Sequence, residues 1–187
     1  LKYQKFPMYN FKISSRMGMV NMPEVVITGL GPVAPNGIGI DQFWGALKAG
    51  KSGIRQINSF GTSESGFMVA GEIPREEFAG YEPFEESKGA WCSYLIKNAA
   101  YLALRDAQVT KKEFSQSPSG IRVGVSTIDM EVGEREYELF KADGSTKSTV
   151  VADSFPHAAA SEIARELKCT GKVLTFSSAC SSGLVSI

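Results

Sequence analysis

Residues 172–187 read KVLTFSSACSSGLVSI, and this stretch is the most informative part of the sequence for predicting the fold. It opens with a short apolar, β-branched run over residues 173–176, which is the pattern of a buried strand. A run of very small residues follows, with Cys180 near its centre. A strand that turns sharply into a helix needs small residues on either side of a nucleophile at the corner. The stretch therefore predicts a strand, a tight turn carrying Cys180, and a buried helix over residues 183–187.

The position predicted for Cys180, at the N-terminal end of a helix, suits a reactive thiol. Backbone N–H groups and the helix dipole at that end favour the thiolate, which is the nucleophilic form of cysteine. A structural role is the alternative, because free cysteine is among the most buried residue types. From spacing alone, both interpretations of Cys180 stay open. No carboxylate or histidine lies nearby in sequence to activate the surrounding serines, which we expect to be small fillers and hydrogen-bonding groups: Ser177, Ser178, Ser181 and Ser182.

Composition narrows the possible partners. Apolar residues make up 43% of the 187 residues, charged residues 21%, and the formal net charge is zero, as in ordinary globular proteins. Nothing in this charge attracts nucleic acid or an anionic membrane, and no apolar run approaches the roughly 20 residues that span a bilayer. Cys92, Cys169 and Cys180 form no CxxC pair and no metal-ligand spacing. We therefore expect reduced thiols in a cytoplasmic protein, no metal site, no nucleic-acid partner and no membrane partner.

Strand and helix patterns alternate along the chain. Strands are predicted over residues 23–31 (PEVVITGLG), 68–73 and 121–126 (IRVGVS), with a Gly/Pro loop after the first. Helices are predicted over residues 41–50, 87–108, 131–142 and from about 154 to 167, with Asp41 and Ser154 as N-caps and Gly50 as a stop. Apolar strands separated by helices predict an α/β fold with a mostly parallel sheet covered on both faces.

Three of the four predicted helices present one apolar face. The expected buried side chains are Phe43, Trp44 and Leu47 in the first helix, Trp91, Leu95, Ala99 and Leu102 in the second, and Ala160, Ile163, Ala164 and Leu167 in the last. The acidic residues of the third helix are expected to face solvent: Glu131, Glu134, Glu136 and Glu138.

A dinucleotide site is excluded at the first glycine-rich turn. The string Gly29-x-Gly31-x-x-Ala34 follows a predicted strand, as a phosphate-binding loop would. However, Pro32 and Pro35 remove backbone donors and disfavour a helix there. No acidic residue follows a second strand at the distance of roughly 20 residues that ribose binding requires. No cofactor-binding residue is therefore assigned.

Residues 1–23 are basic, with four Lys or Arg and no Asp or Glu. Basic, acid-poor segments occur in targeting peptides, but this one lacks a clear amphipathic period. We expect a basic N-terminal extension over residues 1–23, followed by one domain over residues 24–187.

The sequence resembles a known family in two separated places. VVITGLGPVAPNGIGIDQFWGALKAGKSGI, from Val25, looks like the opening of the β-ketoacyl synthases, and SSACSSG is similar to their nucleophile motif, Thr-Ala-Cys-x-Ser/Thr/Gly-Gly. The resemblance implies the thiolase-like fold, a five-layered α/β/α/β/α arrangement of which this chain is the N-terminal half, truncated just after the nucleophile. Residues 87–91 and the segment PHAAASEIA depart from the usual pattern, which favours a polyketide-type synthase over fatty-acid synthesis.

The resemblance also implies a chemistry. Cys180 would accept an acyl group from the phosphopantetheine of an acyl carrier protein and condense it with malonyl-carrier protein after decarboxylation, with no resident cofactor. The two histidines and the lysine that assist in the family are not found here, because His157 matches neither histidine motif and is expected to be an ordinary helix-terminal residue. The 187-residue chain alone is therefore expected to be inactive.

The full-length protein is expected to form a homo- or heterodimer, as the family does. Two alternatives remain: a non-catalytic subunit of the chain-length-factor type, against which Cys180 argues, and a degradative thiolase, whose nucleophile usually lies nearer the N-terminus.

Overall fold

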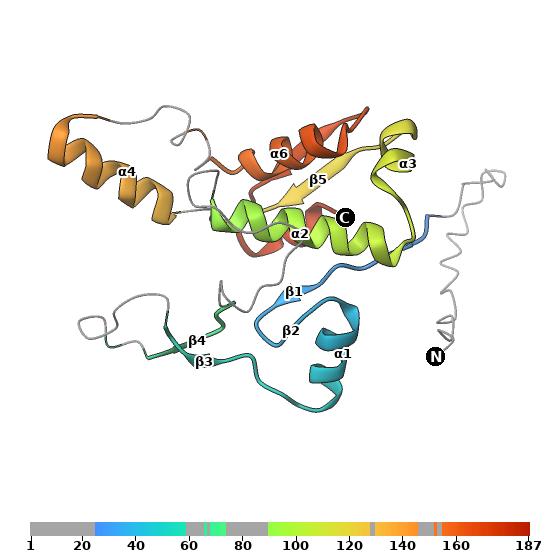
Figure 1. Cartoon of the computed structure of the whole chain (residues 1–187), viewed down its shortest axis with the longest axis horizontal. Coiled ribbons are helices and arrows are strands. Elements are labelled where there is room, and N and C mark those ends of the chain that lie inside the picture. Colours follow the sequence, from blue (N-terminus) through green and yellow to red (C-terminus); the bar gives the residue numbers. More distant parts are fainter. Residues whose placement is uncertain are drawn as a thin grey trace, which may run out of the picture.

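The computed structural model describes residues 25–58, 66, 68–73, 90–127, 130–145, 152 and 155–187 (Figure 1). Its strands are β1 (Val33–Ala34), β2 (Gly37–Ile38), β3 (Arg55–Gln56), β4 (Val69–Ala70), β5 (Ile121–Gly124) and β6 (Val173–Phe176). Its helices are α1 (Ile40–Lys48), α2 (Trp91–Asp106), α3 (Lys111–Gln116), α4 (Met130–Asp143), α6 (Ala158–Leu167), a 3₁₀ turn at Ala179–Ser181, and α7 (Ser182–Val185). The predicted N-terminal extension lies outside the described residues.

The parallel pair β5–β6 forms the centre of the fold. Its register pairs Ile121 with Val173 and Gly124 with Phe176. Both strands and their parallel pairing are confirmed. Among the described residues, however, this is the single parallel pair, because β1–β2 and β3–β4 are antiparallel. β6 is also less buried than predicted, with Val173 38% and Leu174 40% exposed.

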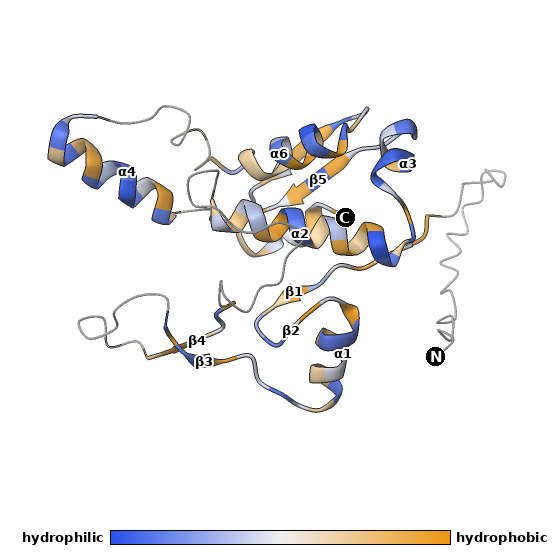
Figure 2. Ribbon diagram, in the orientation of Figure 1, coloured by the Kyte–Doolittle hydropathy of each residue, from blue (hydrophilic) through white to orange (hydrophobic). Residues whose placement is uncertain are grey.

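Helices α2 and α6 pack together over one face of this pair (Figure 1). One apolar cluster joins Val123 of β5 and Val125 just after it to Ala159 and Ala160 of α6, with Cys92 and Ile96 of α2 against it. A second joins Tyr101 of α2 to residues further along α6 and to Ile121 of β5. The start of α2 therefore lies near the C-terminal end of β5, and the end of α2 lies near the N-terminal end of β5. Figure 2 shows the largely apolar colouring of β5, which appears between α2 and α6 in this view.

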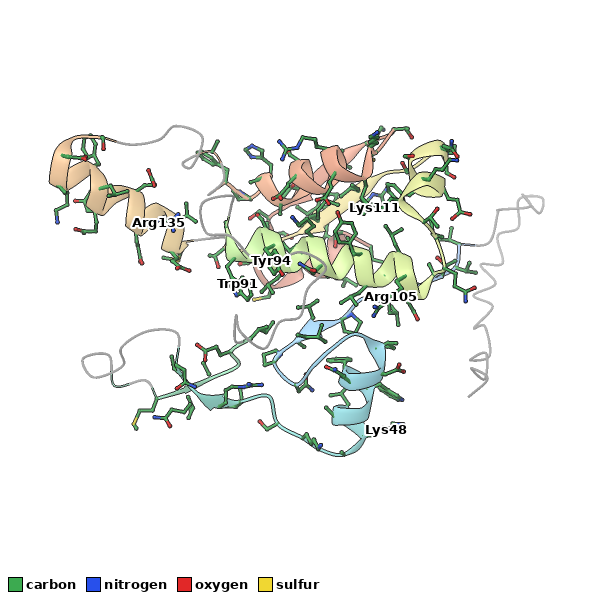
Figure 3. The ribbon with its side chains drawn as sticks, viewed as in Figure 1. Lys48, Trp91, Tyr94, Arg105, Lys111 and Arg135 are labelled. Carbon is green, nitrogen blue, oxygen red and sulfur yellow. The ribbon has the colours of Figure 1, made fainter. Side chains whose placement is uncertain are left out.

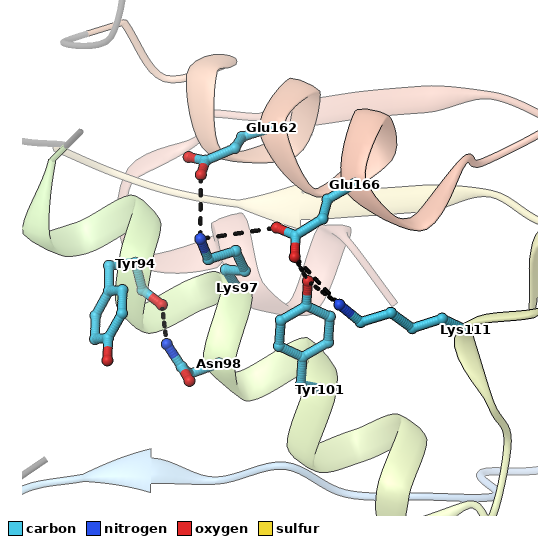
Figure 4. Close-up of polar contacts among 7 residues, drawn as sticks. All are labelled: Tyr94, Lys97, Asn98, Tyr101, Lys111, Glu162 and Glu166. Atoms are coloured by element: carbon cyan, nitrogen blue, oxygen red, sulfur yellow. Dashed lines mark hydrogen bonds and ion pairs between the residues drawn. The ribbon is translucent and has the colours of Figure 1, made fainter. Parts of the chain in front are cut away.

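A polar cluster fixes how α2 and α6 lie against each other (Figure 4). Lys97 Nζ lies 3.4 Å from Glu162 Oε1 and 3.7 Å from Glu166 Oε2. The Tyr101 hydroxyl bonds to the Glu166 carboxylate, and Lys111 Nζ lies 3.2 Å from Glu166 Oε1. Lys97 contacts Glu162, and Tyr101, one turn later in α2, contacts Glu166, one turn later in α6. The two helices therefore run parallel, with their N-termini at the same end.

The buried face of α2 is more polar than predicted. Of the four expected side chains Leu102 is buried and the other three are half-buried, whereas Tyr94, Asn98 and Tyr101 are buried as well. Asn98 can be buried because its Nδ2 donates to the Tyr94 carbonyl oxygen at 2.8 Å. The sequence pattern located the helix, but its apolar period identified only part of the face that packs. Figure 3 places Trp91 and Tyr94 at the start of α2 and Arg105 near its end.

Residues 25–32 are not a buried strand, so that prediction is wrong. Val25 is 95% and Ile27 79% exposed, and the segment has no regular secondary structure. Instead it runs alongside α2 in the opposite direction, where a Cβ on Gly29 would lie 2.3 Å from the Ala103 carbonyl oxygen and one on Gly31 2.0 Å from the Ala99 carbonyl oxygen. These glycines therefore serve close packing on a helix, a role that does not involve a phosphate. The predicted loop that follows contains the short β1–β2 hairpin.

Helix α1 begins differently from the prediction. Its N-cap is Gly39, with φ 79°, and Asp41 lies in the first turn. Gly50, with φ 62°, follows the helix as predicted. Trp44 and Leu47 are 51% and 47% exposed, so the apolar face of α1 is only partly covered.

Helix α3 was not predicted, although its start carries a capping box. Thr110 Oγ1 accepts from the Glu113 N–H at 3.2 Å, and the Glu113 carboxylate accepts from the Thr110 N–H at 2.8 Å. The backbone hydrogen bond from Thr110 lowers the pKa of Glu113. Because this folded-state pKa is depressed, the contribution of the box is present above the ordinary Glu pKa and is lost as the pH falls through the lowered one.

Helix α4 agrees with its predicted range, whereas α6 begins at Ala158, later than the predicted start near residue 154. Helix α4 projects away from the core in Figure 1. Its Glu136 is buried, although the acidic residues of this helix were expected to face solvent. In α6, Ala159 is buried in addition to Ala160, Ile163 and Leu167, while Ala164 is half-buried. The α6 N-cap is His157, and the predicted cap Ser154 lies outside the described residues.

Candidate active site

Cys180 lies on the turn that joins β6 to α7. The chain leaves β6 at Phe176, makes a 3₁₀ turn over Ala179–Ser181 and enters α7. Cys180 is exposed and its thiol is free of any disulfide. The predicted path from strand to turn to helix is therefore present. The predicted burial of the helix is not, since α7 has four residues and Leu184 is 78% exposed.

The turn holds Ala179, the residue before the cysteine, in a left-handed backbone conformation. Its φ of 50° is uncommon for a residue with a Cβ. Such a conformation costs roughly 1–2 kcal/mol and persists only where surrounding contacts hold it. The sharp change of direction at Ala179 turns the chain away from the strand and presents Cys180 at the surface.

Serine hydroxyls supply contacts that hold the turn. Ser182 is 3% exposed, and its Oγ accepts from the Ser178 N–H at 2.8 Å and donates to the Ala179 carbonyl oxygen at 2.7 Å. Ser181 Oγ donates to the Ser178 carbonyl oxygen at 2.8 Å. At about 0.5–1.5 kcal/mol for each bond, these interactions are comparable to the backbone strain. The expectation that these serines are hydrogen-bonding groups is confirmed for Ser178, Ser181 and Ser182.

Gly124, at the end of β5, allows α7 to approach the sheet. An added Cβ would lie 2.2 Å from the Ser182 carbonyl oxygen and 2.8 Å from the Gly183 nitrogen. Its neighbours Val123 and Val125 face α2 and α6, so Gly124 faces the opposite side, where α7 lies. Sequence reasoning missed this residue. A glycine inside the apolar run IRVGVS is the available signal, since such glycines mark close backbone approach.

The other residues considered from sequence lie elsewhere. The His157 ring is exposed and stacks on Phe155, with centroids 5.9 Å apart, which agrees with a helix-terminal role. Cys92 and Cys169 are half-buried, and Cys169 Sγ lies 3.5 Å from the Ser119 carbonyl oxygen. A pocket of about 570 Å³ lies between the end of α2 and the start of α3. That end of α2 lies near the start of β5, whereas Cys180 follows the end of β6.

Two further features bear on the site. Within the part of the chain that the structure describes, no cluster of three or more His, Cys, Asp or Glu side chains could hold a metal ion. The helices in those same residues include none with the length and apolarity to cross a membrane.

Comparison with known families decides what kind of chain carries this turn. The family model described as "Beta-ketoacyl synthase, N-terminal domain" matches residues 22–187. The chain belongs to the β-ketoacyl synthase family. Cys180 therefore lies on the strand-to-helix turn of a β-ketoacyl synthase N-terminal domain, with the motif SSACSSG around it.

Relatives of this β-ketoacyl synthase domain include polyketide synthase subunits and a 3-oxoacyl-[acyl-carrier-protein] synthase. The ketoacyl synthase alpha subunit of the tetracenomycin polyketide synthase of Streptomyces glaucescens is 31% identical over 176 residues, which cover 86% of this chain and 40% of that protein. The beta subunit from the same organism is 33% identical over 123 residues, which cover 64% of this chain and 30% of that protein. The 3-oxoacyl-[acyl-carrier-protein] synthase 2 of Synechocystis is 24% identical over 133 residues, covering 70% and 32%.

Solved β-ketoacyl synthases share the fold. A β-ketoacyl synthase from Burkholderia phymatum superposes with a TM-score of 0.70 at 28% identity, covering 88% of this chain and 41% of that one. The ishigamide ketosynthase/chain length factor, at 22% identity, superposes with a TM-score of 0.68. The match covers 81% of this chain and 39% of that one. The predicted fold class, the N-terminal half of the thiolase-like α/β arrangement, is therefore confirmed. The chain spans about 40% of the length of the alpha-subunit relative.

Proposed function

We propose that Cys180 is the acyl-accepting nucleophile of a β-ketoacyl-[acyl-carrier-protein] synthase. One observation carries the proposal: an exposed, free thiol stands on a strained turn directly after a sheet strand, in a chain of this family. A nucleophile in this position can reach a substrate without displacing the core. Backbone strain stored beside a nucleophile is also a frequent feature of active sites.

The first step of the proposed reaction is a thioester exchange. The Cys180 thiolate attacks the carbonyl carbon of an acyl group carried on the phosphopantetheine thiol of an acyl carrier protein. A bond forms between Cys180 Sγ and the acyl carbon, the bond to the carrier's sulfur breaks, and the carrier thiolate leaves and takes up a proton. The Cys180 N–H can offer one donor to the tetrahedral oxyanion. No resident cofactor takes part in this step.

The second step is a decarboxylative Claisen condensation. Malonyl-carrier protein loses CO₂, and the resulting carbanion attacks the Cys180 thioester, which releases the thiolate and leaves a β-ketoacyl chain on the carrier. The carbanion needs preorganised donors, which the family provides with two histidines and a lysine. The 187 residues contain one histidine, His157, and its ring packs on Phe155. We therefore assign no condensation to this chain acting alone.

A condensation assay checks this assignment. The 187-residue chain, incubated with acyl- and malonyl-carrier protein, is expected to give no β-ketoacyl product above a no-protein blank, read by mass spectrometry of the carrier. The full-length Burkholderia enzyme, under the same conditions, serves as the positive control. Clear product from the pure chain would contradict the assignment.

The proposed partners are an acyl carrier protein and a second synthase subunit. One structural neighbour is titled as a type II polyketide acyl-carrier protein in complex with its ketosynthase. Relatives carry the names of alpha and beta subunits. We therefore place the protein in a polyketide-type synthase, with fatty-acid synthesis as the second pathway, and a homo- or heterodimer as its assembly. Its cytoplasmic location stays a prediction.

A non-catalytic subunit of the chain-length-factor type is the second candidate. The 33% identity to a beta subunit and the ishigamide neighbour favour it. Such subunits typically lack the nucleophilic cysteine, whereas this chain places Cys180 on an exposed turn. The presence of that thiol therefore favours the catalytic candidate.

Acylation mapping separates the two candidates. The protein that carries this chain is incubated with an acyl thioester, or with cerulenin, and the modified peptides are identified by mass spectrometry. We expect the label on Cys180, with the half-buried Cys92 and Cys169 spared. Equal labelling of the three thiols, or no label on Cys180, would remove the enzyme assignment and leave the non-catalytic subunit.

A further inference from the structure

Ser182 differs from the other serines of the turn in what its hydroxyl joins. Its Oγ accepts from the Ser178 N–H at 2.8 Å and donates to the Ala179 carbonyl oxygen at 2.7 Å, so one hydroxyl closes the loop on which Cys180 lies. The residue is 3% exposed, which shields both bonds from water. Both partners precede Cys180, and Ala179 is the residue with the positive φ.

Two nearby serines serve as comparisons. Ser186 Oγ donates to the Gly183 carbonyl oxygen at 2.7 Å, the same spacing of three residues, but this bond does not touch the turn. Ser181 is exposed, and its hydroxyl donates to the carbonyl oxygen and lies 3.0 Å from the hydroxyl of Ser178. Ser182 is therefore buried and also bonds to two backbone groups of the turn, the Ser178 N–H and the Ala179 carbonyl oxygen.

We propose that Ser182 is a positioning residue for Cys180. Its hydroxyl holds Ala179 in the left-handed conformation, which fixes the direction in which the Cys180 thiol leaves the turn. Ser182 touches no reacting atom and acts only through the backbone. The inference rests on the proposed function, because positioning matters only if Cys180 is the nucleophile. The thiol stays exposed without this bond, but its direction is no longer fixed.

The kinetic test compares two reactions of the same thiol. In Ser182→Ala, the rate of acyl transfer to Cys180 from a saturating acyl thioester is expected to fall at least tenfold, with KM changed less than about twofold. The rate of Cys180 alkylation by iodoacetamide, a small reagent that needs no fixed approach, is expected to stay within about threefold. Ser186→Ala, the matched control, keeps the native values for both reactions. Ser182→Thr retains the hydroxyl and is expected to keep most of the acyl-transfer rate.

Hydrogen exchange tests the turn without any substrate. The Ser178 amide is expected to exchange faster in Ser182→Ala, while the Val125 amide, bonded to the Phe176 carbonyl oxygen, keeps its protection and shows that the sheet is folded. An unchanged Ser178 amide, or equal loss of acyl transfer in Ser182→Ala and Ser186→Ala, would overturn the inference. If the native protein takes no acyl group, the proposed function fails, and the exchange data still decide whether Ser182 holds the turn.

Discussion

Replacement of Gly124 by alanine is expected to separate α7 from β5 and to displace the turn that carries Cys180. The new Cβ would lie 2.2 Å from the Ser182 carbonyl oxygen, 2.5 Å from its carbonyl carbon and 2.8 Å from the Gly183 nitrogen. These are backbone atoms, so no side-chain rotation relieves the overlap and the two elements must move apart. Overpacking of this kind costs about 1–3 kcal/mol in the free energy of unfolding. Since Ser182 also bonds to Ala179, acylation of Cys180 is expected to fall with stability.

A second glycine provides the matched control. Gly133 lies in α4, and a Cβ added there would meet nothing within 4 Å. Gly133→Ala is therefore expected to raise the free energy of unfolding by up to about 1 kcal/mol, the difference in helix propensity, and to leave acylation unchanged. Urea denaturation of both variants checks the pair. Effects of the same sign and size would show that the close approach at Gly124 does not matter.

The sequence was informative where an element's identity depends on its own residues. The runs IRVGVS and KVLTF are short, apolar and β-branched, and both form strands that pair in parallel. Ala99 was expected on the packed face of α2, and Gly31 lies against it. In these places local composition and long-range packing agree.

Elsewhere the deciding contact lies far away in the sequence. The run VVITGLG has the composition of a strand, yet its glycines lie along α2, and the Leu30 N–H donates to the Asp106 carboxylate at 2.9 Å. Apolar periodicity cannot say whether a segment pairs with a strand or lies on a helix. The polar buried face of α2 was not predicted for a similar reason: the hydrogen-bond partner of the Tyr101 hydroxyl is Glu166, which lies on another helix.

The residues of the candidate site also fall into those that the local sequence identified and those that depend on distant contacts. Cys180 and the small residues around it were recognisable from one short string, because a sharp turn has local steric requirements. Gly124 was not, because its role depends on α7 lying against the opposite face of β5. The two hydrogen bonds of Ser182 could not be foreseen either, since the string shows that a hydroxyl is present but not which backbone groups it meets.

Replacement of Cys180 by serine is expected to abolish formation of the acyl-enzyme. A serine hydroxyl at neutral pH is a weak nucleophile unless a general base takes its proton, whereas a thiol supplies some thiolate without one. The turn already carries Ser178, Ser181 and Ser182, whose hydroxyls are committed to backbone groups or to one another, so none replaces the thiol. The acylation rate is expected to fall by at least about a thousandfold, as when other enzymes lose their nucleophile. The measurement is the mass of the intact protein after incubation with an acyl thioester.

Two cysteine variants make this result specific to position 180. Cys92 packs against the apolar cluster of β5 and α6, and Cys169 Sγ lies beside the Ser119 carbonyl oxygen, so neither thiol stands on an exposed turn. Cys92→Ser and Cys169→Ser are therefore expected to keep acylation within about twofold of native, provided that circular dichroism shows the fold unchanged. Acylation that persists in Cys180→Ser, or that disappears equally in Cys169→Ser, would mean that the exposed thiol on the β6–α7 turn is not the acyl acceptor. In that case the strain at Ala179 serves the packing of α7 against Gly124 and not the presentation of a nucleophile.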